Sequence, residues 1–95
     1  IQVNETTNTI CDGLRAQIGS VTFPIIKEKV DGIIIVTENE IINSMRMIWE
    51  RMKIIVEPSS TITLAAILKR KELFKGQKVG LILSGGNVDL TKLPF

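Results

Sequence analysis

Two short stretches of the sequence contain no polar residue. One is Ile33-Ile34-Ile35-Val36, which is β-branched throughout, and the other runs from Val79 to Leu83. Apolar runs of this length are typical of strands that are buried on both faces, as in a parallel sheet between helices. We therefore predict strands at 33–36 and 79–83, each of which needs cover on both faces.

The segment after the first run carries the clearest helix signal. Thr37 and Glu40 have the spacing of a capping box, and Val36 and Ile41 have that of a hydrophobic staple. Since proline disfavours the α conformation in the residue before it, we expect this helix to continue through Val56 and to end before Glu57-Pro58. An apolar stripe at helical spacing marks its buried face: Ile41, Met45, Ile48, Met52 and Ile55.

Two further helices are predicted. Phe23 to Val30 forms a short amphipathic helix with Pro24 in its first turn. A later helix is capped by Ser59 or Ser60, is apolar nearly all round over 62–68, and ends with its segment at Gly76. Loops or single turns are expected at 1–8, 15–18 and 91–95.

The predicted order is helix, strand, helix, helix, strand, and long crossovers between strands favour a parallel sheet. Two apolar strands do not form a stable sheet alone, and three helices do not cover both of its faces. We therefore assign residues 1–95 to the α/β class, as one portion of a three-layer α/β/α domain that is incomplete on its own.

Composition narrows the chemistry. The chain has 44% hydrophobic residues, which indicates a packed protein, and it has no histidine, which removes Ser-His and Cys-His pairs and most zinc sites. Its single cysteine, Cys11, is expected to be buried filler in a reducing compartment. No secretory leader and no run of bilayer length is present, so we expect a cytoplasmic protein without membrane contact. The dispersed positive charge does not favour nucleic-acid binding.

Ser84-Gly85-Gly86-Asn87 follows the second predicted strand directly. Ligands of open α/β sheets bind beyond the carboxyl ends of the strands, and two glycines let backbone approach a ligand closely. The same residues also fit an ordinary turn between a strand and a helix. Asp12-Gly13 is likewise a common turn signal.

Four motifs occur in order along the chain: 9–14 (TICDGL), 36–41 (VTENEI), 56–59 (VEPS) and 83–90 (LSGGNVDL). Together they resemble the C-terminal part of the serine racemase and serine/threonine dehydratase family, which comprises pyridoxal-phosphate enzymes of fold type II with the tryptophan synthase beta-like fold. The resemblance covers nearly all of residues 7–91. It implies α-proton abstraction from L-serine or L-threonine, followed by racemisation or by elimination of water and ammonia.

The resemblance also implies cofactor contacts. Ser84 would bond the pyridine nitrogen of pyridoxal phosphate, and Gly85 and Gly86 would let the ring lie close to backbone. Glu57 matches the acidic residue near the ring, and Gly13 matches the turn at the edge of the cofactor cleft.

In ATP-activated racemases the nucleotide binds at a subunit interface, at positions that match Lys53 and Asn87. The resemblance thus implies ATP and Mg²⁺ as activators and a homodimer. The Schiff-base lysine, the phosphate-binding loop and the principal metal ligands of the family lie upstream of Ile1, so no catalytic residue and no metal ligand is expected in this segment. Its partner would be the remainder of the same polypeptide.

Two other classes of function stay open at this stage. The chain also fits a non-catalytic fragment that acts as an interaction or regulatory module. A small phosphate- or nucleotide-binding α/β domain is disfavoured, because neither a Walker lysine nor a strand-GxGxxG-helix pattern is present.

Overall fold

The computed structural model describes residues 9–14, 16 and 18–95. Its elements, in chain order, are the 3-10 turn η1 (Asp12–Leu14) and the helices α1 (Thr22–Lys29), α2 (Glu38–Met52), α3 (Pro58–Lys69) and α4 (Lys71–Phe74). The predicted loop at 1–8 lies outside the described residues, and so do two positions of the predicted turn at 15–18.

Helix α2 begins as the sequence predicts. The Thr37 hydroxyl accepts a hydrogen bond from the Glu40 amide at 3.2 Å, and the Glu40 carboxylate accepts one from the Thr37 amide at 2.9 Å. These bonds complete the capping box, and the one from the Thr37 amide contributes most to holding the pKa of the Glu40 carboxyl below its ordinary value. Val36 packs against the cluster that contains Ile41, which agrees with the predicted hydrophobic staple.

The predicted end of this helix was wrong. The helix stops at Met52, and Lys53 forms its C-cap in the left-handed conformation, with φ 59°. Ile54-Ile55-Val56 leaves the helix because β-branched residues favour extended backbone. As a result, Ile41, Met45 and Ile48 are buried as predicted, whereas Met52 and Ile55 are more than half exposed.

The core lies between α2 and α3. Ile41 of α2 and Ala65 of α3 enclose Cys11, which is only 1% exposed and is the buried filler that the sequence predicts. Burial raises the pKa of the Cys11 thiol above its ordinary value. The helix predicted over 62–68 forms, but most of its apolar residues are only half-buried.

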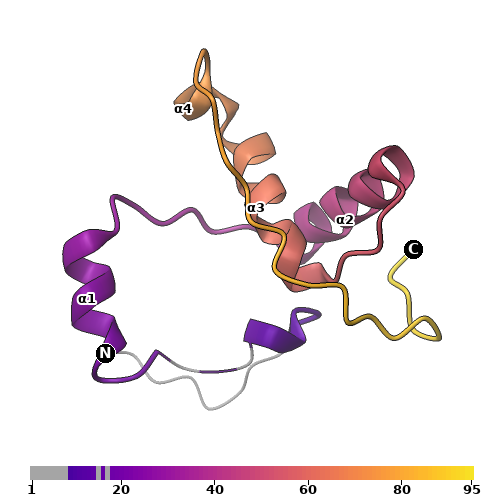
Figure 1. Ribbon diagram of the computed structural model, residues 1–95, viewed down its shortest axis with the longest axis horizontal. Coiled ribbons are helices and arrows are strands. Elements are labelled where there is room, and N and C mark those ends of the chain that lie inside the picture. Colours follow the sequence, from indigo (N-terminus) through magenta and orange to yellow (C-terminus); the bar gives the residue numbers. More distant parts are fainter. Residues whose placement is uncertain (1–8, 15, 17) are drawn as a thin grey trace.

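No strand forms within the described ranges 9–14, 16 and 18–95. In the predicted strands, Ile33, Ile35 and Ile82 are each 79% exposed. Figure 1 shows 30–37 as an arc from α1 to α2, and the segment after α4 as a path that returns along α3. A strand needs a neighbouring strand to pair its backbone N–H and C=O groups, and no described residue provides one along these runs; the Ile35 carbonyl instead accepts a hydrogen bond from the Lys69 ammonium group at 2.7 Å. The parallel sheet therefore stays a prediction.

Helix α1 forms where it is predicted but buries no residue and packs against no other helix of the described chain. Figure 1 shows it apart from the α2–α3 pair. The whole fold measures 38 × 37 × 19 Å, so its thickness is about two helix diameters. This flat shape, together with the exposed isoleucines, fits one part of a larger layered domain.

The C-terminal residues fold back onto α2. Trp49 contacts Phe95 edge to face, with ring centroids 5.4 Å apart, and donates a hydrogen bond from its indole nitrogen to the Val56 carbonyl at 2.9 Å. The predicted tail is therefore docked by its last side chain. Within the part of the chain that the structure describes, no helix has the length and apolar character needed to span a membrane.

Candidate functional site

The first turn of α3 meets the segment that begins at Ser84, the predicted Ser-Gly-Gly-Asn turn. Ser60 is 1% exposed, and its hydroxyl bonds both backbone groups of Gly85, donating to the carbonyl at 2.5 Å and accepting from the amide at 2.8 Å. The hydroxyl oxygen of Ser84 lies 3.5 Å from that of Ser60. One buried side chain thus joins two segments that are distant in sequence.

The residues before α3 lie along the same turn. The Glu57 amide donates a hydrogen bond to the Gly85 carbonyl at 3.1 Å. A Cβ added to Gly85 would lie 2.5 Å from the Glu57 carboxylate, and one added to Gly86 would lie 2.5 Å from the Ile55 carbonyl. A side chain at Gly86 would therefore clash with fixed backbone, whereas one at Gly85 would require the Glu57 carboxylate to move.

The η1 turn closes the other side of the α3 N-terminus. A Cβ on Gly13 would lie 3.2 Å from the Ser59 hydroxyl oxygen, which is a tight contact. That hydroxyl is buried, and its polar neighbour is the Cys11 thiol, whose pKa a side-chain hydrogen bond with Ser59 lowers against the larger effect of burial. Because the chain covers its oxygen, Ser59 belongs to the packing between η1 and α3.

The cluster is chemically mild. Ser84 and Asn87 are exposed, Glu57 is half-buried, and the remaining polar groups are neutral hydroxyls and backbone amides. Such a set can orient a neutral or anionic ligand by hydrogen bonds, but within the described residues it includes no base next to a nucleophile.

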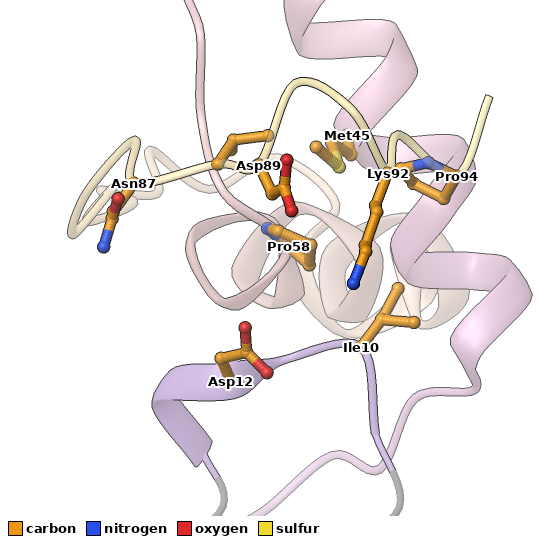
Figure 2. Close-up of a pocket in the computed structure, with 9 residues that line it drawn as sticks. Ile10, Asp12, Met45, Pro58, Asn87, Asp89, Lys92 and Pro94 are labelled. Atoms are coloured by element: carbon orange, nitrogen blue, oxygen red, sulfur yellow. The ribbon is translucent and has the colours of Figure 1, made fainter.

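A cavity of about 380 Å³ opens beside this cluster. Figure 2 shows Asp12 and Asp89 on opposite sides of Pro58, with the Lys92 side chain extending from the tail toward Ile10. Hydrogen bonds from Thr91, chiefly from its hydroxyl, hold the pKa of the Asp89 carboxyl below its ordinary value. No group of three or more His, Cys, Asp or Glu residues could hold a metal ion in the described parts of the chain.

The structure gathers most of the predicted site residues. Gly13, Glu57, Ser84 and Gly85 meet around the first turn of α3, and Gly86 abuts the preceding segment. Asn87 lines the cavity, whereas Lys53 is absent from its described lining. Lys53 instead donates from its ammonium group to the Glu50 carbonyl at 2.5 Å.

Sequence reasoning missed the two serines. Ser59 and Ser60 were predicted as alternative caps, but Glu57 is the N-cap, and no side chain caps this helix. Proline at the first helical position starts the helix at Pro58, two residues earlier than a Ser59 cap and three earlier than a Ser60 cap. The signal in the sequence was the pair of hydroxyl residues directly after Glu-Pro. Small polar side chains in the first turn of a helix can bond a neighbouring segment at that helix end.

Comparisons with known proteins give a consistent result. Residues 1–85 match the family described as "Pyridoxal-phosphate dependent enzyme". The chain is 61% identical over 88 residues to serine racemase from Dictyostelium discoideum, covering 90% of this chain and 27% of that protein. It is 47% identical over 89 residues to L-threo-3-hydroxyaspartate ammonia-lyase from Pseudomonas sp, covering 93% of this chain and 28% of that protein.

The solved structure of maize serine racemase superposes with a TM-score of 0.86 at 46% identity, covering 95% of this chain and 29% of that one. The chain thus spans between a quarter and a third of the length of these three proteins. A family match over 85 of 95 residues is far more than half of the sequence. This chain therefore belongs to the pyridoxal-phosphate dependent enzyme family.

Proposed function

We propose that these residues are the C-terminal part of the cofactor-binding domain of a serine racemase or serine/threonine ammonia-lyase. Support comes from the family match and from the relatives, which include a serine racemase and a hydroxyaspartate ammonia-lyase. The observation that carries the proposal is the hydroxyl cluster at the N-terminus of α3, where the buried Ser60 hydroxyl bonds Gly85 and the hydroxyl oxygen of the exposed Ser84 lies 3.5 Å from that of Ser60.

The residues present fit pyridoxal phosphate. Gly85 and Gly86 have no side chain, so a planar ring can approach the backbone beside the exposed Ser84 hydroxyl. Among the residues that the structure describes, the exposed Ser84 hydroxyl has one hydrogen-bonding neighbour, the Ser60 hydroxyl at 3.5 Å, a distance longer than a normal O–H···O bond. The site thus offers unused hydrogen-bonding capacity rather than a filled network.

Each residue has a role in this proposal. Ser84 donates to the pyridine nitrogen, Gly85 and Gly86 border the ring, and Glu57 and Gly13 line its edges. When bound, pyridoxal phosphate supplies an electron sink for the negative charge that develops at the substrate Cα. A neutral hydroxyl opposite the ring nitrogen makes that sink weaker than a carboxylate does, because it does not hold the nitrogen protonated.

The missing part of the fold belongs to the same polypeptide in this proposal. An open, largely apolar hollow of about 470 Å³ includes Ile34, Val36, Ile41 and Ile62 in its lining. Upstream strands pair with 33–36 and 79–83 to form the parallel sheet of a three-layer α/β/α domain, and upstream residues supply the reactive lysine. We refer to this complete polypeptide as the full-length enzyme.

Regulation and assembly extend the proposal. The full-length enzyme is a cytoplasmic homodimer in this proposal. ATP binds at the interface between its subunits, where it contacts Lys53 and Asn87, and ATP together with Mg²⁺ activates the enzyme. Lys53 is exposed at the end of α2 and Asn87 is exposed next to the cavity, so a nucleotide has access to both.

The test is the full-length enzyme itself. We expect it to bind pyridoxal phosphate, with a visible absorption band, and to convert L-serine to D-serine and pyruvate. The mass of the natural protein is the decisive companion measurement, because a mature protein that begins near Ile1 lacks the reactive lysine. That result would instead support the non-catalytic interaction module.

A further inference from the structure

Ser60 stands out because its hydroxyl engages a single distant residue twice. It contacts the carbonyl of Gly85 at 2.5 Å and the amide of Gly85 at 2.8 Å, and it is 1% exposed. A helix cap would instead bond amides of its own first turn. Ser60 therefore serves the 84–86 turn rather than α3.

The directions of both bonds follow from chemistry alone. A carbonyl oxygen has no proton to give, and an amide N–H has no lone pair to offer. The single hydroxyl proton of Ser60 must therefore go to the Gly85 carbonyl, and one of its two lone pairs must take the Gly85 amide proton. One lone pair is left.

That remaining lone pair decides what Ser60 can do for Ser84. The two hydroxyl oxygens are 3.5 Å apart, and Ser60 has no second proton. Any bond between them must have Ser84 as the donor. At this distance the bond is weak. A better acceptor on the exposed side of Ser84 can therefore replace Ser60 as the acceptor of the Ser84 hydrogen bond.

We propose that Ser60 is a positioning residue that clamps the Gly85 peptide and so holds the Ser84 hydroxyl where its proton can be donated to the pyridine nitrogen. The proposal rests on the proposed function, since it concerns how Ser84 meets the cofactor. Ser60 touches neither cofactor nor substrate. By holding Gly85 at both its N–H and its C=O, it fixes the backbone that carries the Ser84 hydroxyl, and it offers that hydroxyl no proton.

The clamp has a measurable consequence without the cofactor. Ser60→Ala removes the hydrogen-bond acceptor that the structure gives to the Gly85 amide, whereas the Gly85 carbonyl keeps the Glu57 amide. In the cofactor-free full-length enzyme, hydrogen exchange at Gly85 should therefore become faster by about tenfold or more, because an amide without an acceptor loses its protection.

The same substitution should affect cofactor binding. Losing a hydrogen bond that orients a ligand group commonly costs about 1 kcal/mol, which corresponds to a roughly fivefold to tenfold rise in the Kd for pyridoxal phosphate. The absorption maximum of the bound cofactor, or its dependence on pH, should also shift, because the donor opposite the ring nitrogen is no longer held.

Thr61→Val is the matched control. Thr61 is the next residue of α3 and is fully buried, and its hydroxyl lies 2.8 Å from the Pro58 carbonyl, to which it donates, and 3.3 Å from the Ile41 carbonyl, away from residues 84–86. Thr61→Val replaces one buried hydroxyl by a methyl group of similar size, and Ser60→Ala likewise removes one buried hydroxyl. We expect both variants to lower the melting temperature, and only Ser60→Ala to change Gly85 exchange, cofactor affinity and the spectrum.

Two results would overturn the proposal. If Ser60→Ala and Thr61→Val leave Gly85 exchange, cofactor Kd and absorption equally unchanged, Ser60 only fills the core. If the unsubstituted full-length enzyme binds no pyridoxal phosphate, the proposed function fails and the role toward the cofactor fails with it. Faster Gly85 exchange in Ser60→Ala would still support the clamp in that case, so the two failures are distinguishable.

Discussion

The Glu57 amide donates to the Gly85 carbonyl at 3.1 Å, so the N-cap residue of α3 is bonded directly to the glycine pair near the C-terminus. This contact brings the Glu-Pro and Ser-Gly-Gly-Asn motifs together. It also brings the backbone of Ile55 against Gly86, where a Cβ would lie 2.5 Å from a carbonyl oxygen. The site therefore depends on close backbone approach as much as on side chains.

Gly86→Ala should destabilise the full-length enzyme more than Gly85→Ala. At Gly86 the obstacle is the backbone of Ile55, which does not move aside, whereas at Gly85 it is the end of the flexible Glu57 side chain. Overpacking of this kind costs about 1–3 kcal/mol. Thermal melting of both variants measures the difference, and Glu57→Ala combined with Gly85→Ala should recover part of the smaller loss. Equal melting temperatures for Gly85→Ala and Gly86→Ala would contradict the close contact.

Lys53→Gly and Lys53→Ala separate the two roles of Lys53. Both remove the ammonium group, but glycine accepts the left-handed conformation, with φ 59°, more readily than alanine does. We expect the glycine variant to be more stable by about 1 kcal/mol. We also expect both to lose ATP activation to the same extent while binding pyridoxal phosphate normally. Unchanged nucleotide dependence in both variants would remove Lys53 from the nucleotide site.

Acid should weaken the start of α2. The pKa of Glu40 is lowered from 4.5, first by the hydrogen bond from the Thr37 amide. A lowered folded pKa means that the stabilisation is complete above the ordinary pKa and is lost as pH falls through the folded value. A peptide of residues 36–53 should therefore lose helicity, measured by circular dichroism, as pH falls below about 4.5. Glu40→Gln should lose less helicity over this range than Glu38→Gln. A pH response that is unchanged in Glu40→Gln would show that the capping box does not titrate.

Ser84 is the residue on which the cofactor assignment depends most. Ser84→Ala removes one neutral hydrogen bond, worth about 1–3 kcal/mol when its partner is left unpaired, so the Kd for pyridoxal phosphate should rise by roughly tenfold or more. Ser84→Asp should instead favour a protonated ring and change the ratio of racemisation to elimination. Absorbance spectra and both product rates in the full-length enzyme test this. Unperturbed spectra and an unchanged product ratio in both variants would make Ser84 a turn residue only.

The isolated 95 residues should self-associate or fold poorly. Ile33, Ile35 and Ile82 are each 79% exposed in runs that carry no charge, and exposed apolar patches of this kind drive association. Light scattering and thermal melting of the fragment are the appropriate measurements. A sharp, cooperative melt of a monodisperse monomer would show that these runs need no partner.

Local signals in the sequence predicted local structure well. The capping box at Thr37 and Glu40 and the burial of Ile41, Met45 and Ile48 are confirmed, because the first depends on residues three apart and the second on one face of one helix. The predicted end of α2 was wrong. The helical spacing of apolar residues continues through Ile55, but the β-branched run that starts at Ile54 favours extended backbone over helix.

The remainder was not accessible from local patterns. Whether 33–36 and 79–83 become strands depends on backbone partners that the described residues do not provide, so periodicity alone does not decide it. The clamp at Ser60 joins positions that are far apart in sequence, and nothing in the neighbourhood of Ser60 identifies Gly85 as its partner. The cluster was therefore predicted in part through Glu57, Ser84 and Gly85, but not through Ser59 and Ser60.

Trp49 gives this chain a built-in optical reporter. It is the single tryptophan of the sequence, its indole nitrogen bonds the Val56 carbonyl, and its ring meets Phe95 at the C-terminus. Release of either segment exposes the indole to water, which moves its fluorescence emission to longer wavelength. The docking of the segment at Val56 and of the tail at Phe95 against α2 can thus be followed in real time without any added label.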